Sequence, residues 1–391
     1  MRWRGKPHRR GRCDAARLAV KVALACPTIG QTRRGYERFF CDLHRILAPD
    51  IDTRLFKGAG EGTARETVVP HLRRTGVLSR LLRQRLAYRR YQLEHASFAA
   101  MLAPALMRGG FDVVHVIDPP LAHHLHRLRR ITGLRYRLLY THGGPATVDP
   151  GSGVDHVHCL TESARSLMQG LGVPAAKLSV VPVGMDFQAF KPAGARAALR
   201  AQWDVPLSQP LVLCVGAVNR QHKRIDHLIR EMAAAGGDAL LWLDGSLHPD
   251  GDPELLALGQ QLLGPRFRYT EVDSGRIGEL YGAADLLVSA ALDESFGMAV
   301  VEAMSTGLPV LVHDNPHFRA LLGDAVHRVD MAVPGALAAA LQRLLSSSPV
   351  TPPAQDARAA VARFGWPVLR NAYLDLYRHV AGPRNQTSEL N

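Results

Sequence analysis

Residues 285–315, DLLVSAALDESFGMAVVEAMSTGLPVLVHDN, read as a strand, a helix and a second strand in direct succession. The apolar runs 285–292 and 309–315 are too short for helices and are rich in Leu and Val, as buried strands are. The segment between them has a helical composition and ends at Gly307, a residue type that commonly terminates helices. Because two strands joined through a helix lie parallel in one sheet, this stretch predicts an α/β fold.

The same alternation of short apolar runs and helix-like segments occupies most of the 391 residues. Further strands are predicted in two series, at 18–26, 53–58, 112–118, 136–142, 156–160 and 178–184, and at 210–218, 239–245 and 266–272. Segment 186–209 contains Pro192 and Pro206 and no periodic apolar pattern, so we place a domain junction there. We therefore predict two doubly wound, Rossmann-like domains that face each other across a cleft.

The domain boundaries follow from these two series of strands. We predict a basic N-terminal extension over residues 1–17, a first Rossmann-like domain over 18–190 and a second over 191–365. Residues 366–391 form a last helix, expected to pack back on the first domain, and a polar tail.

The positive charge of the chain lies in its first half. Residues 1–190 contain 30 basic and 14 acidic residues, a net charge of +16, whereas residues 191–391 contain 18 and 21, a net charge of −3. This asymmetry predicts either a polyanionic or membrane-surface partner, or an arginine-rich face that is simply solvated. We expect no nucleic-acid partner, because the arginines of residues 73–90 lie on a helix-like segment and not among stacking aromatics. Leucines alternate with them at helical spacing, which suits an anionic lipid surface.

Cysteine content and hydropathy predict the cellular location. The five cysteines are odd in number and scattered, without a CxxC pair, so neither a disulfide framework nor a zinc site is indicated. The apolar run 18–26 is short and broken by Lys21, so we expect no signal peptide. No uncharged run reaches the roughly 18 residues of a membrane span. We predict a cytoplasmic protein and leave open a peripheral association with the inner face of the membrane.

The loop before the helix in 285–315 offers a phosphate-binding site. Ser295 is a candidate N-cap, which would leave the amides of Phe296, Gly297 and Met298 pointing out of the first turn. Free amides at a helix start attract phosphate, and a glycine lets the ligand approach closely.

Two carboxylates lie on either side of these amides. Glu294 precedes the helix, and Glu302 lies one helical turn after Met298. Carboxylates accept hydrogen bonds and therefore suit hydroxyl-rich groups such as a hexose or a ribose. Two sugars with phosphate between them make a nucleotide sugar, which is the ligand we predict. The alternative is structural: a loop acid, and a helix acid on a solvated face.

Four stretches of the chain together resemble one enzyme family. SFGMAVVEAMSTGLPVL (295–311) resembles the second-domain signature of family 4 glycosyltransferases, which are retaining enzymes with the two-domain GT-B fold. Residues 180–192, 215–229 and 364–377 resemble the inter-domain segment, the donor-phosphate loop and the terminal helix of that family. The resemblance implies transfer of a hexose from a nucleotide sugar to a hydroxyl acceptor (a glycan, a lipid or a small molecule) without a metal. It assigns the donor to the second domain and the acceptor to the first.

The resemblance also implies roles for the residues around the helix start. Glu294 would contact hydroxyls of the transferred sugar, and Glu302 the nucleoside ribose. The amides of Phe296, Gly297 and Met298 would contact the sugar and phosphate of the donor.

The donor-phosphate loop departs from the family pattern. Lys223 and Arg220 would neutralise the diphosphate leaving group, the task that a metal performs in other transferases. Ala217 stands where the family has an arginine, and the spacing from glycine to lysine is one residue longer, so Arg220 is a substitute assignment. The nucleotide base is expected at the backbone of Thr270, Glu271 and Val272.

The first domain carries two further expected site residues. Residues 27–40, PTIGQTRRGYERFF, resemble the glycine-rich loop of the family, in which Gly35 matches and Arg34 replaces a glycine. THGG (141–144) follows a predicted strand and places His142 at the cleft edge, where it would touch the donor sugar or the acceptor.

In this chemistry the leaving diphosphate itself takes the proton of the acceptor, so neither glutamate is an acid or a base. Three other possibilities stay open. A nucleotide-sugar epimerase shares the architecture, and a non-catalytic relict would bind membrane or nucleic acid. Metal dependence is less favoured, because Asp50–Asp52 and Asp250–Asp252 suit turns. His123, His124 and His126 have no carboxylate or cysteine partner at ligand spacing.

Overall fold

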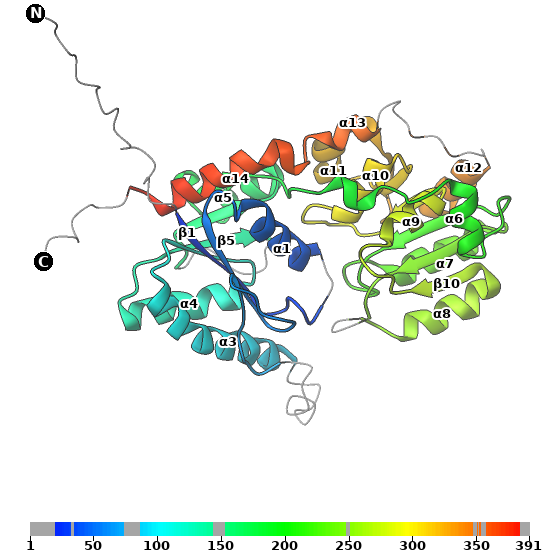
Figure 1. Cartoon of the computed structure of the whole chain (residues 1–391). Coiled ribbons are helices and arrows are strands. Elements are labelled where there is room, and N and C mark those ends of the chain that lie inside the picture. The colour runs from blue at the N-terminus through cyan, green and yellow to red at the C-terminus, as the bar shows by residue number, and fades with distance from the viewer. Residues whose placement is uncertain are drawn as a thin grey trace, which may run out of the picture.

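The computed structural model describes residues 20–32, 35–73, 87–143, 153–247, 251–346, 350, 352 and 357–383, with no side chains for 87–89. Several predictions fall outside these residues: the basic extension 1–17, Arg34, the arginine- and leucine-rich stretch 74–86, Gly144, Asp250, and most of the C-terminal tail. The described chain forms two α/β units that lie side by side (Figure 1).

A parallel seven-stranded sheet forms the centre of the first domain, with the strand order β3-β2-β1-β4-β5-β6-β7. Its strands are β1 (Lys21–Cys26), β2 (Asp52–Lys57), β3 (Glu66–Val68), β4 (Val113–Val116), β5 (Arg137–His142), β6 (His156–Cys159) and β7 (Leu178–Val180). The central strands are buried along almost their whole length, as strands covered on both faces are. The sequence did not reveal β3, because a three-residue edge strand shows no apolar alternation.

A parallel six-stranded sheet forms the second domain, with the order β10-β9-β8-β11-β12-β13. Its strands are β8 (Leu211–Val215), β9 (Leu240–Asp244), β10 (Phe267–Thr270), β11 (Leu286–Ser289), β12 (Val310–His313) and β13 (His327–Val329). The short edge strand β13 was also missed by the sequence. Both orders reverse beside the first strand of their domain, which is the arrangement that places ligands at the carboxyl ends of the strands.

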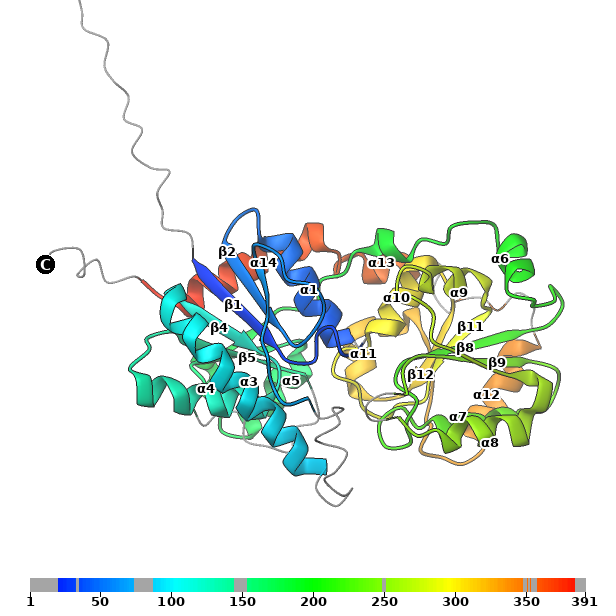
Figure 2. The same cartoon turned by 60° about the horizontal axis from the view of Figure 1, so that its bottom comes forward.

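Helices cover both faces of each sheet (Figures 1 and 2). The first domain has α1 (Gly35–Leu47), α3 (Ala87–Gly109), α4 (Pro119–Thr132), α5 (Glu162–Gly170) and the short η2 (Ala175–Lys177). The junction and second domain have η3 (Phe187–Phe190), α6 (Arg196–Gln202), α7 (Ile225–Ala235), α8 (Glu254–Leu263), η4 (Gly264–Arg266), α9 (Ile277–Ala283), α10 (Met298–Thr306), α11 (Pro316–Leu322), η5 (Gly323–Ala325), α12 (Ala336–Leu345) and α13 (Ala357–Ala362). Within the described part of the chain, none of them is both long and apolar enough to cross a bilayer.

The last helix, α14 (Trp366–Ala381), returns to the first domain (Figure 2). At the crossing, the amide of Met185 donates to the carbonyl of Phe364 (2.9 Å), and the amide of Trp366 donates to the carbonyl of Met185 (3.1 Å). The Tyr377 hydroxyl then lies 2.8 Å from His115 Nδ1 on β4. The two domains are therefore joined by two adjacent crossings of the chain.

Candidate functional site

The two domains meet at the amino-terminal ends of α1 and α10. A side chain at Gly35 would clash with Met298, because an added Cβ atom would lie 2.7 Å from its Sδ. The Ser295 hydroxyl donates to the carbonyl of Gly143, which follows β5, over 2.7 Å. Tyr36, on α1, also donates its hydroxyl to that carbonyl. Residues from both domains therefore converge on one place, at the carboxyl ends of the two sheets.

The helix start differs from the predicted one, and the assignment of Ser295 as N-cap is wrong. Helix α10 begins at Met298, and its N-cap is Gly297 in the left-handed conformation (φ 86°, ψ 48°). The prediction failed because the sequence around Ser295 does not reveal that its hydroxyl donates to Gly143 in the other domain. The amides left free by the helix geometry therefore include that of Met298 and those of the two following residues. A small pocket of about 20 Å³ lies over them and is also lined by Lys223 and Glu294.

Glu294 and Lys223 form an ion pair in this pocket. The Lys223 ammonium donates to Glu294 Oε1, and the Glu294 side chain is only 8% exposed. Burial has the largest single effect on the pKa of the Glu294 carboxyl and raises it, but the charge and hydrogen bond of Lys223, together with His222 and His317, lower the pKa overall. Glu294 is therefore ionised at neutral pH, with His222 Nε2 4.0 Å from its second oxygen.

Asn219 holds the backbone of the loop that carries Lys223. Its side-chain oxygen accepts hydrogen bonds from the amides of His222 (3.0 Å) and Lys223 (2.9 Å). Such a side-chain turn fixes the backbone of the loop immediately before α7. Sequence reasoning did not single out Asn219, although an asparagine before a helix is a known turn signal.

Arg220 lies in the same loop but has other partners. Its guanidinium pairs with Asp252, and its Nη2 lies 3.4 Å from Glu254. The structure brings Lys223 together with Glu294 and does not bring Arg220 to them. A contact between Arg220 and a diphosphate stays a prediction.

Glu302 lies on α10, one helical turn after its first residue, Met298. It is 7% exposed, and the Tyr281 hydroxyl donates to its Oε2 over 2.7 Å. Burial raises the pKa of the Glu302 carboxyl, which Arg38 of the first domain partly opposes. The guanidinium of Arg38 is stacked on the ring of Phe190 at 4.5 Å from its centroid. Glu302 therefore lies beside the first domain, and its contact with a ribose stays a prediction.

The predicted base site at residues 270–272 is organised by Asp244, at the end of β9. Asp244 Oδ1 accepts hydrogen bonds from the Thr270 hydroxyl (2.8 Å) and the Val272 amide (2.9 Å). Glu271 Oε1 accepts one from the Tyr269 hydroxyl (2.5 Å). A base that uses the Val272 amide must therefore replace the carboxylate of Asp244, a partner that the sequence did not indicate.

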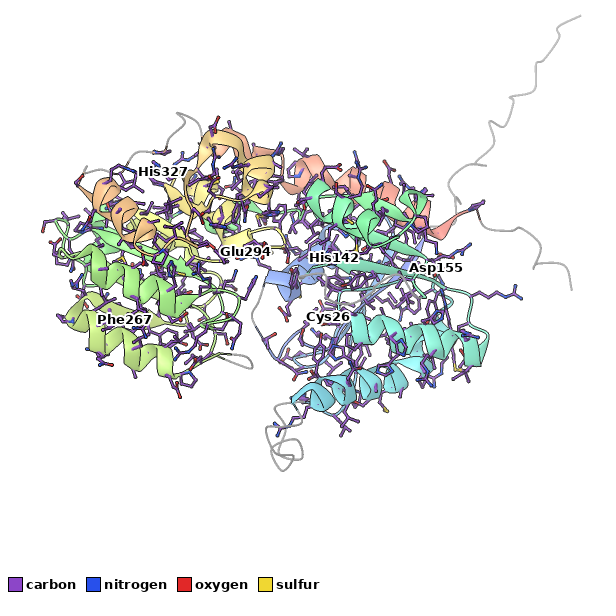
Figure 3. All side chains as sticks on the ribbon, turned by 180° about the vertical axis from the view of Figure 1, so that it is seen from behind. Cys26, His142, Asp155, Phe267, Glu294 and His327 are labelled. Carbon is purple, nitrogen blue, oxygen red and sulfur yellow. The ribbon has the colours of Figure 1, made fainter. Side chains whose placement is uncertain are left out.

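His142 is the last residue of β5 and is 6% exposed. Burial lowers the pKa of its imidazole, so the ring is neutral at neutral pH. Figure 3 shows His142 and Glu294 on the sides of their domains that face each other. The neutral ring is suited to a hydrogen bond with a hydroxyl group of a substrate.

The candidate metal-binding motifs do not gather into a cluster within the part of the chain that the structure describes. Residues 20–32, 35–73, 87–143 and the other described ranges contain no group of three or more His, Cys, Asp or Glu suited to hold a metal ion. Asp50 pairs with Arg370 of α14. His123, His124 and His126 lie on α4.

Comparison with known proteins identifies the second domain. The family described as "Glycosyl transferases group 1" matches residues 195–361. A D-inositol 3-phosphate glycosyltransferase from Xylanimonas cellulosilytica is 34% identical over 229 residues, which are 55% of this chain and 54% of the relative. Another from Kineococcus radiotolerans is 30% identical over 248 residues, which are 56% of each protein. The chain thus spans about half the length of the curated relatives that it matches.

Solved structures show the fold of the whole chain. Sucrose-phosphate synthase from Thermosynechococcus elongatus superposes with a TM-score of 0.77 at 20% identity, covering 92% of this chain and 99% of that one. The Anabaena protein HepE in complex with UDP and glucose superposes with a TM-score of 0.73 at 16% identity, covering 91% and 99%. The expected two-domain fold is therefore confirmed, and so is the resemblance read from the second domain. The chain has the GT-B fold, and residues 195–361 of its second domain match the family described as "Glycosyl transferases group 1".

Proposed function

We propose that this protein is a retaining glycosyltransferase that transfers a hexose from a nucleotide sugar to a hydroxyl acceptor without a metal. The observation that carries the proposal is the Lys223–Glu294 pair, which lies beside the free amides at the start of α10. A cation and free amides suit a diphosphate, and an ionised carboxylate suits sugar hydroxyls. The second domain, which holds these groups, is also the part that the family matches.

The proposed reaction needs no proton carrier from the protein. The acceptor hydroxyl attacks the anomeric carbon on the face that the diphosphate leaves. The bond from that carbon to the diphosphate oxygen breaks, and the departing diphosphate takes the proton of the acceptor. Lys223 and the amides at the start of α10 stabilise the growing negative charge, and Glu294 orients the sugar. Since Lys223 keeps Glu294 ionised, this carboxyl is an acceptor of hydrogen bonds and not an acid.

The donor is better supported than the acceptor. HepE is described in complex with UDP-glucose, and the curated relatives are D-inositol 3-phosphate glycosyltransferases, so UDP-hexoses and D-inositol 3-phosphate are the first compounds to test. The family match lies in the donor domain, and acceptor contacts are expected in the first domain. Glycan, lipid and small-molecule acceptors therefore all stay within the proposal.

Nucleotides are expected to stabilise the folded protein. A ligand that binds only the folded state adds about 2.7 kcal/mol at a hundredfold excess over its Kd, which raises the unfolding temperature. We expect at least one of UDP, GDP and ADP to give this shift, and the Lys223→Ala variant to lose most of it. The measurement is a thermal-shift series with the three diphosphates and their hexose derivatives, with the matching nucleosides as controls.

Consumption of a nucleotide sugar with and without an added acceptor distinguishes transfer from epimerisation. We expect its consumption to require an added acceptor, beginning with D-inositol 3-phosphate and unphosphorylated inositol. Conversion of the donor sugar at full rate without an acceptor would contradict the proposal and favour the epimerase.

A second role, peripheral binding to an anionic membrane, is favoured by the outer surface of α3 and α4. Leu93, Met101 and Met107 of α3 and Ile131 of α4 are apolar and exposed, Ile131 to 82%. At about 100° per residue, the three residues of α3 lie within an arc of about 120°, so they are on the same side of the helix. These two helices pack against each other and present a common surface (Figure 2).

The charge of this surface matches anionic lipid. Arg108, Arg127 and Arg130 are exposed on the same two helices. Glu94 is their only acidic residue, and it is 1% exposed. Apolar side chains together with cations, without exposed carboxylates, are typical of an interfacial membrane surface.

The protein is therefore expected to co-sediment with vesicles that contain phosphatidylglycerol, and not with vesicles of phosphatidylcholine alone. High salt should weaken the binding, because it screens the arginines. We expect the Met107→Glu variant to lose most of the binding. Leu167→Glu, which places the same charge at an exposed apolar position of α5, should keep it. Equal binding to neutral vesicles, or a variant Met107→Glu that binds as the wild type does, would contradict this role.

A further inference from the structure

Arg224, directly after Lys223, has an unusual backbone conformation. Among the described residues, only Asp204 and Arg224 are non-glycine residues with a positive φ. Arg224 lies in the left-handed region, at φ 50° and ψ 43°. Aspartate tolerates this region because its short side chain bonds locally, but arginine has no such compensation. The surroundings must therefore hold Arg224 in a conformation that is unfavourable in itself.

The side chain of Arg224 supplies this restraint. Its Nη1 donates to the carbonyl of Met331 over 2.9 Å and lies 3.5 Å from the carbonyl of Ala290. Met331 follows β13 and is fully buried, so one anchor point is rigid. Ala290 follows β11 directly, in the segment that leads to Glu294. The guanidinium therefore joins the loop of Lys223 to the base of the loop of Glu294.

The left-handed conformation of Arg224 also makes its side chain and that of Lys223 point in different directions. Lys223 reaches Glu294 in the pocket, whereas Arg224 reaches backbone carbonyls of the domain core. Asn219 binds the amides of the loop on the side that precedes this turn. Helix α7 begins directly after it, at Ile225. The backbone of Lys223 is thus fixed on both sides, and Arg224 provides the second fixed point.

We propose that Arg224 is a positioning residue that holds the ammonium of Lys223 in place for the diphosphate of the donor. The inference rests on the proposed function and extends it to a residue that does not itself touch the substrate. It explains why a strained arginine stands where a glycine would fit the backbone without strain. The strain is retained because the side chain makes the contacts with Met331 and Ala290 that a glycine lacks.

Two substitutions separate positioning from folding and from charge. Arg224→Gly relieves the backbone strain and removes the anchor, so its unfolding temperature is expected to stay close to that of the wild type. Arg224→Lys keeps the charge, but the lysine side chain is one bond shorter, so its ammonium is not expected to reach the carbonyls of Met331 and Ala290 that Nη1 contacts. Asp204→Gly is the matched control, because it relieves the other left-handed residue, at the domain junction.

The probe is inorganic pyrophosphate, which has the charge of the leaving group and no base or sugar. We expect calorimetry to show about tenfold weaker binding of pyrophosphate to both Arg224 variants, as for one weakened hydrogen bond from the displaced Lys223 ammonium to the charged ligand. In turnover assays, kcat should fall by a similar factor, with little change in the KM for the acceptor. Asp204→Gly should match the wild type in both measurements.

The outcomes distinguish this inference from the proposed function. Wild-type affinity for pyrophosphate in Arg224→Gly would overturn the positioning role alone. Full recovery in Arg224→Lys would also overturn it, because charge and not geometry would then matter. If the wild type and Lys223→Ala bind pyrophosphate equally, the diphosphate site itself is wrong, and the proposed function fails with the inference.

Discussion

The Lys223→Ala variant is expected to lose transfer activity about a hundredfold to a thousandfold in kcat while the protein stays folded. Removing one preorganised group that stabilises transition-state charge typically costs about 3–4 kcal/mol in the barrier. Lys223 is the cation that the structure places in the pocket over the start of α10. The departing diphosphate would lose the partner nearest to its developing charge, and the amides alone would remain.

The partner of Lys223 complicates a single substitution. Glu294 is 8% exposed, so removing Lys223 leaves a mostly buried carboxylate without the ammonium that neutralises it. Breaking such a pair destabilises the fold by itself, by about 3–5 kcal/mol for a fully buried pair. The double variant Lys223→Ala with Glu294→Gln removes that charge. We expect it to recover stability in urea unfolding and to recover no activity.

Two further variants serve as controls for the expected loss of kcat in Lys223→Ala. Lys177→Ala removes an exposed lysine of the first domain and should leave kcat unchanged. Arg220→Ala should cost less than Lys223→Ala, about tenfold, because Arg220 must first leave Asp252 to reach a diphosphate. Initial rates at saturating donor and acceptor provide the measurement. A kcat within threefold of wild type in Lys223→Ala would refute the catalytic assignment.

The fold was largely predictable because its strands are buried on both faces. Continuous apolar runs such as 211–215 and 286–289 stand out in any window of sequence. The edge strands Glu66–Val68 and His327–Val329 did not stand out, because three residues at the edge of a sheet need no apolar pattern. Their pairing depends on neighbours that are distant in the sequence.

The sequence named candidate site residues, but it did not indicate how they pair. Glu294 was singled out by its place before the helix and Lys223 by the family resemblance, yet their ion pair joins positions 71 residues apart. Ser295 has the composition of a helix cap, but its hydroxyl bonds to Gly143, 152 residues away. Capping and turn preferences describe hydrogen bonds between residues that are close in the sequence. Lys223 and Ser295 instead bond to residues of another loop or another domain. The left-handed conformation of Arg224 was not predictable either, because the carbonyls that its side chain contacts, those of Ala290 and Met331, are distant in the sequence.

A chain of buried hydrogen bonds beneath α14 predicts how stability depends on pH. His158 Nε2 lies 2.8 Å from the carbonyl of Val181, which only accepts, so Nε2 must carry the hydrogen. His158 Nδ1 then accepts from the Thr141 hydroxyl, 2.8 Å away. Thr141 in turn accepts from His115 Nε2 (2.6 Å), and His115 Nδ1 accepts from the Tyr377 hydroxyl (2.8 Å). Each imidazole is therefore neutral, and an additional proton would find no acceptor.

Burial lowers the pKa of His158 from its ordinary 6.5 to about 4, and it lowers the pKa of His115 well below 6.5. A histidine with a lowered pKa binds a proton more readily in the unfolded chain than in the folded one. Its contribution to stability is complete above pH 6.5 and is lost as the pH falls from there towards 4. For His158 alone, the loss at pH 4.5 is about 2–3 kcal/mol.

We therefore expect the free energy of unfolding to fall between pH 7 and pH 4.5, and His158→Gln to reduce that fall by about 2–3 kcal/mol. Glutamine can donate to Val181 and accept from Thr141 as the imidazole does, but it does not titrate. Urea unfolding at pH 7.0, 5.5 and 4.5 measures the difference, and the carboxylates contribute equally to both proteins. Parallel pH profiles for wild type and His158→Gln would show that His158 titrates alike in both states, and the hydrogen-bond chain would not hold it neutral.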